Sequence, residues 1–368
     1  MLEVTIGIDG RELSAGIRTG IGRYLAAVIR GARRQGVDCV VYSDRELPTL
    51  EALQGAAVRI VPRRPTLWWD QISLPRRLAK DQISVFLSPY YKGPLWASCP
   101  VVLTIHDLLF IEYLGQARPV YDRVMTWLAG LYAGRAAAII TDSEHAKRTI
   151  ASRLVIGAQR ITVIPLSVAP EFRPVPSGEE VYQRHAVRRP YVLYVGNFLP
   201  HKNLLRLVQA FAGLAEAVRR NCSLVLAGDY ADRRHTILGE ARRLGIREKV
   251  VLTGVVADAD LPALYAGCEA FVMPSLDEGF GLPAVEAMAC GAPVIVSNRA
   301  SLPEVVGDAA LQVDPLRAEA IGEALAAVLS DRGLQENLRR RSLARAEMFR
   351  GDRAAQRVLA LVREVAGG

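Results

Sequence analysis

Short runs of apolar, often β-branched residues alternate with helix-like segments along almost the whole chain. The runs lie at residues 4–9, 37–43, 83–89, 101–107 and 137–143, and again at 191–197, 223–229, 249–254, 270–275 and 293–298. Most are nearly continuous in apolar residues, as expected for parallel strands covered by helices on both faces. Helical patterns fit between them, for example at 22–34, 120–135 and 204–214. The alternation predicts an α/β fold with two doubly wound parallel sheets.

A proline-rich stretch separates the two series of predicted strands. A chain of 368 residues is long enough for two domains of ordinary size. Residues 165–190 contain five prolines and little hydrophobic periodicity, which is typical of a linker. We therefore expect an N-terminal domain over 1–175 and a C-terminal domain over 176–345. Residues 346–368 are expected to form a final helix that crosses back to the N-terminal domain.

Composition and cysteine usage exclude several classes of protein. The chain is 51% hydrophobic and 23% charged, which is typical of a soluble globular protein. No stretch approaches the ~18 uncharged apolar residues of a membrane-spanning helix, and residues 4–9 resemble a strand rather than a secretory signal. The five cysteines are scattered without CxxC spacing. This pattern argues against a zinc site or a disulfide framework and favours the cytoplasm.

Positive charge is concentrated in the first half of the chain. Residues 1–178 contain 22 Lys and Arg against 15 Asp and Glu, whereas residues 179–368 contain 24 against 23. This excess of positive charge would suit the binding of nucleic acid, anionic lipid or a phosphorylated substrate. It is equally compatible with arginines that only solvate the domain. The basic residues are dispersed and lack interleaved aromatic side chains, so a nucleic-acid-binding protein is disfavoured.

Two carboxylates flank a glycine-rich turn in the second half. Glu278 follows the predicted strand 270–275, and Glu286 lies inside the helix that begins after Gly279 and Gly281. Ligands of open α/β sheets bind beyond the carboxyl ends of strands, where helix N-termini present free N–H groups. Glycines let the backbone approach such a ligand, and carboxylates can accept hydrogen bonds from polyols. A glycine-rich turn with a capping acid also occurs for structural reasons alone.

A second strand, turn and helix carry a cation. Lys202 lies at the turn after the strand 191–197, next to His201 and Asn203. A helix N-terminus is already positive, so a lysine at this place implies an anion to neutralise it, such as a phosphate or diphosphate. In the first half, residues 19–24 form a weaker anion-loop pattern, and His106 ends the strand 101–107. A lone histidine is more often structural, but its position at a strand terminus favours function.

Taken together, these segments resemble the large retaining GT-B family often called glycosyltransferase family 4. The segment 274–315 is similar to its donor-binding core, and Glu278 and Glu286 match its EX7E motif. Residues 191–211, the TIHD element and the TGIGRY loop follow the family's order. LWWDQISLP at 67–75 is similar to the bacterial subgroup that builds O-antigen and exopolysaccharide chains, many of whose members are mannosyltransferases.

The resemblance implies a role for each matching residue. Gly20 is expected to bring a backbone N–H to the donor diphosphate, which Lys202 neutralises. Glu286 is expected to hold the nucleotide ribose, and His106 to face the reacting sugar. Asn197 stands in the phosphate turn where many relatives carry an arginine, which weakens the expected neutralisation.

The resemblance also implies the residues around the transferred sugar. Glu278 is expected to hydrogen-bond its hydroxyls, with the backbone of Phe280, Gly281 and Leu282 around it. Val255, with Val256, lies where the family places its base-binding loop. Glu278 could instead act as a nucleophile, and the sequence does not decide between the two roles. No DxD-type motif follows a strand, so neither a metal nor another cofactor is expected.

The expected function is retaining transfer of a hexose from a nucleotide sugar, in a cleft between two Rossmann-like domains whose parallel sheets face each other. GDP-mannose is the favoured donor, with UDP- and dTDP-sugars or a GT-B nucleotide-sugar epimerase as alternatives. The expected acceptor is a glycan, linked to polyprenyl diphosphate, in the synthesis of cell-surface polysaccharide such as lipopolysaccharide. Peripheral contact with the inner face of the cytoplasmic membrane is expected through basic residues, here Arg63, Arg64, Arg76 and Arg77.

Overall fold

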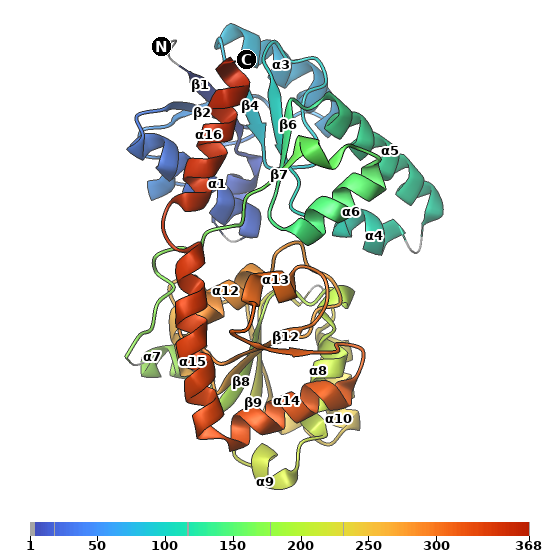
Figure 1. The fold of residues 1–368 in the computed structure, drawn as a ribbon, viewed down its shortest axis with the longest axis vertical. Coiled ribbons are helices and arrows are strands. Elements are labelled where there is room, and N and C mark those ends of the chain that lie inside the picture. Colours follow the sequence, from blue (N-terminus) through green and yellow to red (C-terminus); the bar gives the residue numbers. More distant parts are fainter. Residues whose placement is uncertain (1–3, 18, 116–117, 177, 231, 368) are drawn as a thin grey trace. The chain divides into compact units, whose positions relative to one another are not determined.

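The computed structural model describes residues 4–17, 19–115, 118–176, 178–230 and 232–367 and forms two compact units (Figure 1). Unit 1 contains the described residues of Met1–Ser167 and Gly351–Gly368, and unit 2 contains those of Val168–Arg350. Each unit is a parallel sheet with helices packed on it. The predicted α/β architecture with two parallel sheets is therefore confirmed.

The sheet of unit 1 has seven parallel strands in the order β3-β2-β1-β4-β5-β6-β7. These strands are β1 (Thr5–Asp9), β2 (Asp38–Ser43), β3 (Ala57–Ile60), β4 (Val85–Ser88), β5 (Val101–Thr104), β6 (Ala138–Thr141) and β7 (Ile161–Val163). The strand order changes direction between β1 and β4. In doubly wound sheets such a switch point opens a crevice at the carboxyl ends of the strands.

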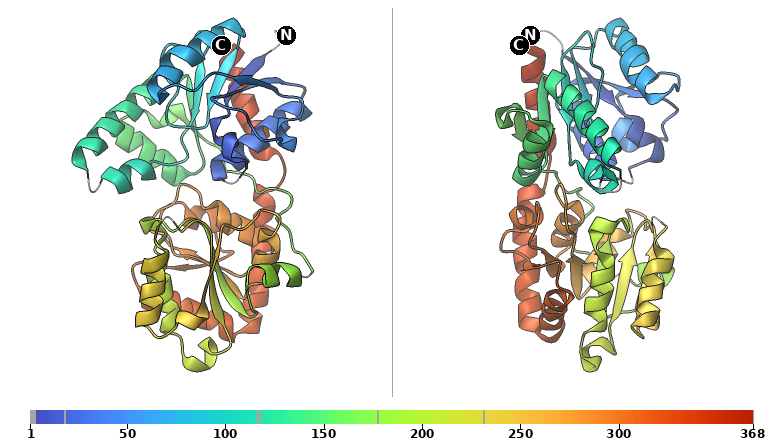
Figure 2. Two further views of the ribbon diagram at one scale, coloured as in Figure 1. Left: turned by 180° about the vertical axis from the view of Figure 1, so that it is seen from behind. Right: turned by 90° about the vertical axis from the view of Figure 1, so that its right-hand side faces the viewer.

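Helices cover both faces of this sheet (Figure 2). They are α1 (Gly20–Arg34), α2 (Thr66–Trp68), α3 (Leu74–Lys80), α4 (Leu109–Gly115), α5 (Pro119–Arg135), α6 (Glu144–Leu154) and α16 (Arg353–Gly367). One buried cluster joins α3, α5 and α6 to the sheet. The C-terminal helix α16 lies beside α1, where Arg34 forms an ion pair with Asp352 and Gly31 leaves room for Ala355. The last helix of the chain thus belongs to unit 1.

The sheet of unit 2 has six parallel strands in the order β10-β9-β8-β11-β12-β13. These strands are β8 (Tyr191–Val195), β9 (Ser223–Ala227), β10 (Val250–Gly254), β11 (Ala270–Met273), β12 (Val294–Ser297) and β13 (Leu311–Val313). The order again changes direction, here between β8 and β11. The carboxyl ends of β8 and β11 are therefore the expected place for a ligand in this unit.

The helices of unit 2 also lie on both faces of its sheet (Figure 2). They are α7 (Glu179–Arg184), α8 (Leu204–Ala212), α9 (Glu216–Arg219), α10 (Arg234–Arg243), α11 (Leu261–Gly267), α12 (Leu282–Ala289), α13 (Leu302–Val306), α14 (Ala318–Ser330) and α15 (Arg332–Ala346). α8, α10 and α14 share one buried cluster with the sheet. On the other face, Tyr265 of α11 packs edge-on against Phe271 of β11. None of the described helices is both long enough and apolar enough to span a bilayer.

Candidate functional site

Two residues that the sequence predicts for donor binding form an ion pair in unit 2. Lys202 ends the short helical turn Pro200–Lys202 after β8, and Glu278 lies in the loop after β11. Because β8 and β11 are neighbours, their carboxyl ends bring the two loops together. Lys202 Nζ donates to Glu278 Oε1 at 2.6 Å, and the two side chains are only 14% and 8% exposed. Sequence analysis assigned both residues but did not predict their contact.

Backbone anchors hold the two loops in place. Asn203 has a left-handed backbone, and its Nδ2 donates to the carbonyls of Pro274 and Pro315 at 3.0 and 2.7 Å. The hydroxyl of Ser301 donates to the Glu278 carbonyl at 2.8 Å. These bonds fix the start of α8 against the end of β11, so the Lys202–Glu278 pair lies on a rigid support.

The turn after β8 carries one cation, Lys202. His201 is buried, and its pKa is lowered to about 4 by burial and by the neighbouring charge of Lys202. The imidazole is therefore neutral at pH 7 and supplies no second positive charge. Asn197 is exposed at the turn, and its carbonyl accepts the Tyr194 hydroxyl at 2.8 Å.

Glycine is required where α12 begins. Gly281 has φ 92°, in the left-handed region, and a Cβ there would lie 2.5 Å from Leu302 Cδ2. The side chains of Phe280 and Leu282 are buried on either side of it. What this turn can offer a ligand is consequently its backbone. That the backbone of these three residues surrounds the transferred sugar stays a prediction.

Glu286 and Val255 lie in very different surroundings. Glu286 is 1% exposed in the second turn of α12 and accepts a hydrogen bond from the Tyr265 hydroxyl at 2.9 Å. Val255 follows β10 and is 66% exposed, whereas Val256 beside it is buried. Their predicted contacts with ribose and base stay predictions.

In unit 1, His106 is paired with a carboxylate that sequence analysis missed. His106 Nδ1 lies 2.6 Å from Asp142 Oδ2, at the carboxyl ends of the neighbouring strands β5 and β6. Its Nε2 is buried and has no hydrogen-bond partner within the described ranges. The sequence contained a signal for this pair, because Asp142 lies at the carboxyl end of β6 just as His106 lies at the carboxyl end of β5.

The surroundings of His106 favour the imidazolium. Burial lowers the pKa of His106, but the charge and hydrogen bond of Asp142, with Asp107 and Glu12 further away, outweigh it and leave the pKa raised. The ring of Tyr24 lies edge-on to the imidazole with centroids 5.2 Å apart, and its hydroxyl is bonded to Thr104. The ring is therefore held from two sides, by Asp142 and by Tyr24.

Gly20 is the first residue of α1. The hydroxyl of Thr19 caps this helix by accepting from Gly22 N at 3.0 Å, and a Cβ atom at Gly20 would meet no described residue within 4 Å apart from its chain neighbours and its own helix. Gly20 and His106 thus lie in unit 1, whereas the other predicted site residues lie in unit 2.

No group of three or more His, Cys, Asp or Glu suited to a metal occurs in the described part of the chain. The absence of a cofactor stays a prediction.

Family comparisons cover both halves of the chain. A family described as "Glycosyltransferase Family 4" matches residues 18–172, and one described as "Glycosyl transferases group 1" matches residues 180–345. The O-antigen chain mannosyltransferase B of Escherichia coli is 36% identical over 257 residues, which cover 67% of this chain and 66% of that protein. The O-antigen chain mannosyltransferase RfbU of Salmonella typhimurium is 28% identical over 313 residues, or 81% and 83% of the two chains.

The chain spans less than two thirds of the first of these relatives, and only 27% of the serotype-specific mannosyltransferase WbdA of Escherichia coli, which is 32% identical over 221 residues. Sucrose-phosphate synthase from Thermosynechococcus elongatus has the same fold, with a TM-score of 0.82, 21% identity and coverage of 98% and 99% of the two chains. The family matches and this fold agree on one assignment. The chain belongs to the GT-B glycosyltransferases of family 4 and group 1, among which its relatives include O-antigen mannosyltransferases.

Proposed function

We propose that this protein transfers a hexose from a nucleotide sugar to a glycan acceptor with retention of the anomeric configuration. The observation that carries the proposal is the Lys202–Glu278 pair at the carboxyl ends of β8 and β11. The pair joins a cation that could bind a diphosphate to a carboxylate that could accept sugar hydroxyls, and it lies in the unit that matches the group 1 family, which supports the proposal. A cation can bind the phosphates of a sugar diphosphate, and a carboxylate can accept hydrogen bonds from its sugar hydroxyls.

The residues of the turn would act mainly on the leaving group. Lys202 has three N–H donors, so it can keep its bond to Glu278 and still donate to a phosphate oxygen. Charge that develops on the departing diphosphate is stabilised by this cation and by the backbone N–H groups at the start of α12. Retention then follows from attack on the same face, with the leaving phosphate accepting the acceptor's proton. In the alternative mechanism, Glu278 attacks first as a nucleophile.

The product's configuration tests the mechanism. NMR coupling constants of the anomeric proton, measured early in the reaction, should show the same configuration as in the donor. An inverted product would exclude both the same-face mechanism and the double displacement through Glu278. Formation of a new nucleotide sugar without any acceptor would instead favour the alternative of a GT-B epimerase.

The proposed donor is GDP-mannose, with UDP- and dTDP-sugars as alternatives. The relatives named above are mannosyltransferases, which supports mannose as the transferred sugar. A nucleotide sugar that binds the native state alone should raise the free energy of unfolding by roughly 2.7 kcal/mol at about 100 times its dissociation constant, so at one fixed concentration the sugar that binds most tightly stabilises most. We expect GDP-mannose to give the largest rise in melting temperature at equal concentration. A larger rise with a uridine or thymidine nucleotide would replace it as the donor.

The proposed acceptor is carried on polyprenyl diphosphate, so the enzyme would work at a membrane surface. Arg63, Arg64 and Arg76 are exposed, but Arg77 donates to Asp81 at 2.8 Å and is less available to a lipid headgroup. Unit 1 also exposes an apolar stripe on α5, in which Val120, Val124 and Trp127 are 74%, 52% and 68% exposed. Exposed tryptophan is typical of surfaces that lie in the membrane interface.

Vesicle flotation tests this contact. Recovery with vesicles should rise with anionic lipid content and fall at high salt, because each basic residue near the surface contributes about 1 kcal/mol. Neutralising Arg63, Arg64, Arg76 and Arg77 should weaken flotation in low salt. Trp127→Ser should weaken it also in high salt, whereas Val155→Ser, a change at an apolar residue that is 89% exposed elsewhere in unit 1, should not. Equal recovery with neutral and anionic vesicles would contradict the electrostatic contribution.

A further inference from the structure

Unit 1 contains a basic cavity that the donor residues do not explain. The cavity measures about 730 Å³ and lies where β1, β2 and β4 end, at the switch point of the sheet. Its lining residues come mostly from the loops after these strands and after β3: Arg11, Asp44, Arg45, Arg63, Arg64, Pro65, Thr66, Trp69, Tyr90, Tyr91 and Lys92. Doubly wound sheets bind their ligands at this kind of place.

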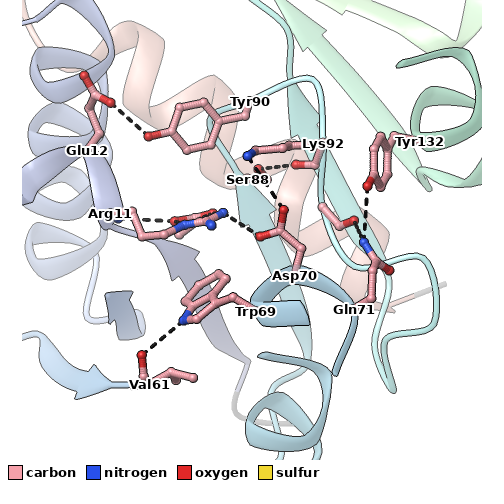
Figure 3. A network of polar contacts seen from close by, with 12 residues as sticks. Arg11, Glu12, Val61, Trp69, Asp70, Gln71, Ser88, Tyr90, Lys92 and Tyr132 are labelled. Carbon is pink, nitrogen blue, oxygen red and sulfur yellow. Dashed lines mark hydrogen bonds and ion pairs between the residues drawn. The ribbon is translucent and has the colours of Figure 1, made fainter. Parts of the chain in front are cut away.

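A buried network forms one wall of the cavity (Figure 3). The Arg11 guanidinium contacts Asp9 at 2.5 Å and Asp70 at 2.8 Å, and it lies 3.9 Å from the centre of the Trp69 ring. Asp9 and Asp70 are almost completely buried, and Lys92 lies 3.7 Å from Asp70. These contacts fix Arg11 and orient Lys92 before any ligand arrives.

The WWDQ segment builds this wall through an unusual helical turn. Trp69–Ser73 is a π-helical turn, a conformation that is often found at functional sites. The indole of Trp69 donates to the Val61 carbonyl at 3.1 Å, and the Gln71 amide bonds to Gly93 and Leu95. The segment is therefore bonded to the chain after β3 and to the chain after β4. Residues from both of these loops line the cavity, so the segment lies next to it.

The charges that face the cavity are mainly positive. Five of the lining residues are cationic, and Asp44 is the one acid among them. Arg45 and Arg63 share that carboxylate, at 3.0 and 3.8 Å, and Arg64 has no ion pair with any described residue. Even if the nearby Asp9, Asp70 and Glu12 are counted, the cations are in excess. A neutral ligand would leave this excess uncompensated.

We propose that this cavity binds the phosphate or diphosphate group carried by the acceptor. The inference rests on the proposed function for the acceptor's identity, but the anion site itself does not. Planar guanidinium groups of Arg63 and Arg64 suit bidentate contact with phosphate oxygens, and Lys92 adds a point charge in the same cavity. Tyr90, Tyr91 and Pro65 provide the apolar and aromatic surface on which the attached carrier or sugar would pack.

Paired soluble acceptors test the site without any membrane. The same oligosaccharide is supplied on a short alkyl diphosphate and, separately, on an uncharged octyl aglycone. The double variant Arg64→Ala, Lys92→Met should raise KM for the diphosphate acceptor by about tenfold or more, since each lost contact is charge-assisted. KM for the uncharged acceptor and for the donor should stay within about twofold of the wild-type value, an allowance of a few tenths of a kcal/mol.

Matched controls are available in the same unit. Arg148 on α6 and Lys80 on α3 are exposed and do not line the cavity, so Arg148→Ala, Lys80→Met should leave both KM values unchanged. An equal rise for both acceptors in the cavity variant would show that the residues hold the sugar or the fold rather than the anion. No rise for either acceptor would also overturn the proposal.

Calorimetry separates the site from the proposed function. The alkyl diphosphate is titrated into protein whose donor site is saturated with nucleoside diphosphate. Binding that is lost in the Arg64→Ala, Lys92→Met variant and kept in the control supports the cavity even if no transfer is found with any donor. If the saturated wild-type protein does not bind the alkyl diphosphate, the anion site is wrong, whatever the enzyme's activity.

Discussion

Glu278→Gln should reduce transfer by about 10²–10³-fold, because the variant loses a charged contact to the sugar in the transition state. Nucleoside diphosphate binding should persist and even strengthen, since Lys202 is then free of its partner at 2.6 Å. Breaking so buried a pair costs about 3–5 kcal/mol of stability, so the ligand-free variant should melt lower. Nucleoside diphosphate should restore much of that loss by supplying a new anion. Rates, calorimetry and thermal melts measure the three effects.

Lys202→Met should have the opposite effect on nucleoside diphosphate binding, which it should weaken. Removing the cation takes away a charge-assisted contact to the diphosphate, so nucleoside diphosphate affinity should fall about 10–100-fold. Lys249→Met is the matched control, because Lys249 lies at the amino end of β10, at the opposite edge of the same sheet. If Glu278→Gln weakens nucleoside diphosphate binding and Lys202→Met does not, the assignment of sugar and phosphate between them is wrong.

Asp142→Asn should lower kcat by about 10–100-fold, as expected when the carboxylate that orients a functional histidine is removed. The raised pKa of His106 depends on Asp142, and burial alone lowers it. In the wild type the imidazolium therefore persists above the ordinary histidine pKa of about 6.5, and the variant loses it at lower pH. If the protonated form acts on the sugar, the alkaline limb of activity should move to lower pH in the variant.

The same pair makes a linked contribution to stability. Since the folded pKa of His106 is raised, the stabilisation is fully present below the unfolded value and disappears as pH rises through the folded value. Asp122→Asn, at a carboxylate that pairs with Arg153 on the surface of unit 1, provides the control. Profiles of kcat/KM against pH that coincide for wild type and Asp142→Asn would show that His106 does not act through its charge.

The strands that the sequence missed all lie at the edges of the sheets. All ten predicted strands are present, from β1 to β12. The three missed strands, β3, β7 and β13, are edge strands of three or four residues, whereas the fourth edge strand, β10, has five residues and was predicted. Central strands are buried on both faces and need continuous apolar sequence, whereas an outer strand is partly exposed and leaves little pattern.

In the candidate site too, the sequence predicts one part and leaves another part undetermined. The boundaries between strands and turns in the sequence predict that Glu278, Lys202 and His106 lie at the carboxyl ends of their strands, and parallel strands present all their carboxyl ends at one edge of the sheet. The sequence did not show which residue each of these side chains contacts. Lys202 and Glu278 are 76 residues apart, and His106 and Asp142 are 36 apart. Whether two such loops touch depends on which strands become neighbours.

The sequence by itself therefore determined the two parallel sheets, the turns that carry the candidate donor residues and the excess of positive charge in the first half. Hydrophobic periodicity and turn residues act locally, so they can be read along the chain. Only the tertiary structure decided which charges are compensated. It paired Lys202 with Glu278 and His106 with Asp142, and it gathered Arg11, Arg64 and Lys92 around one cavity. Strand order determines these contacts, and strand order results from packing over long distances in the chain.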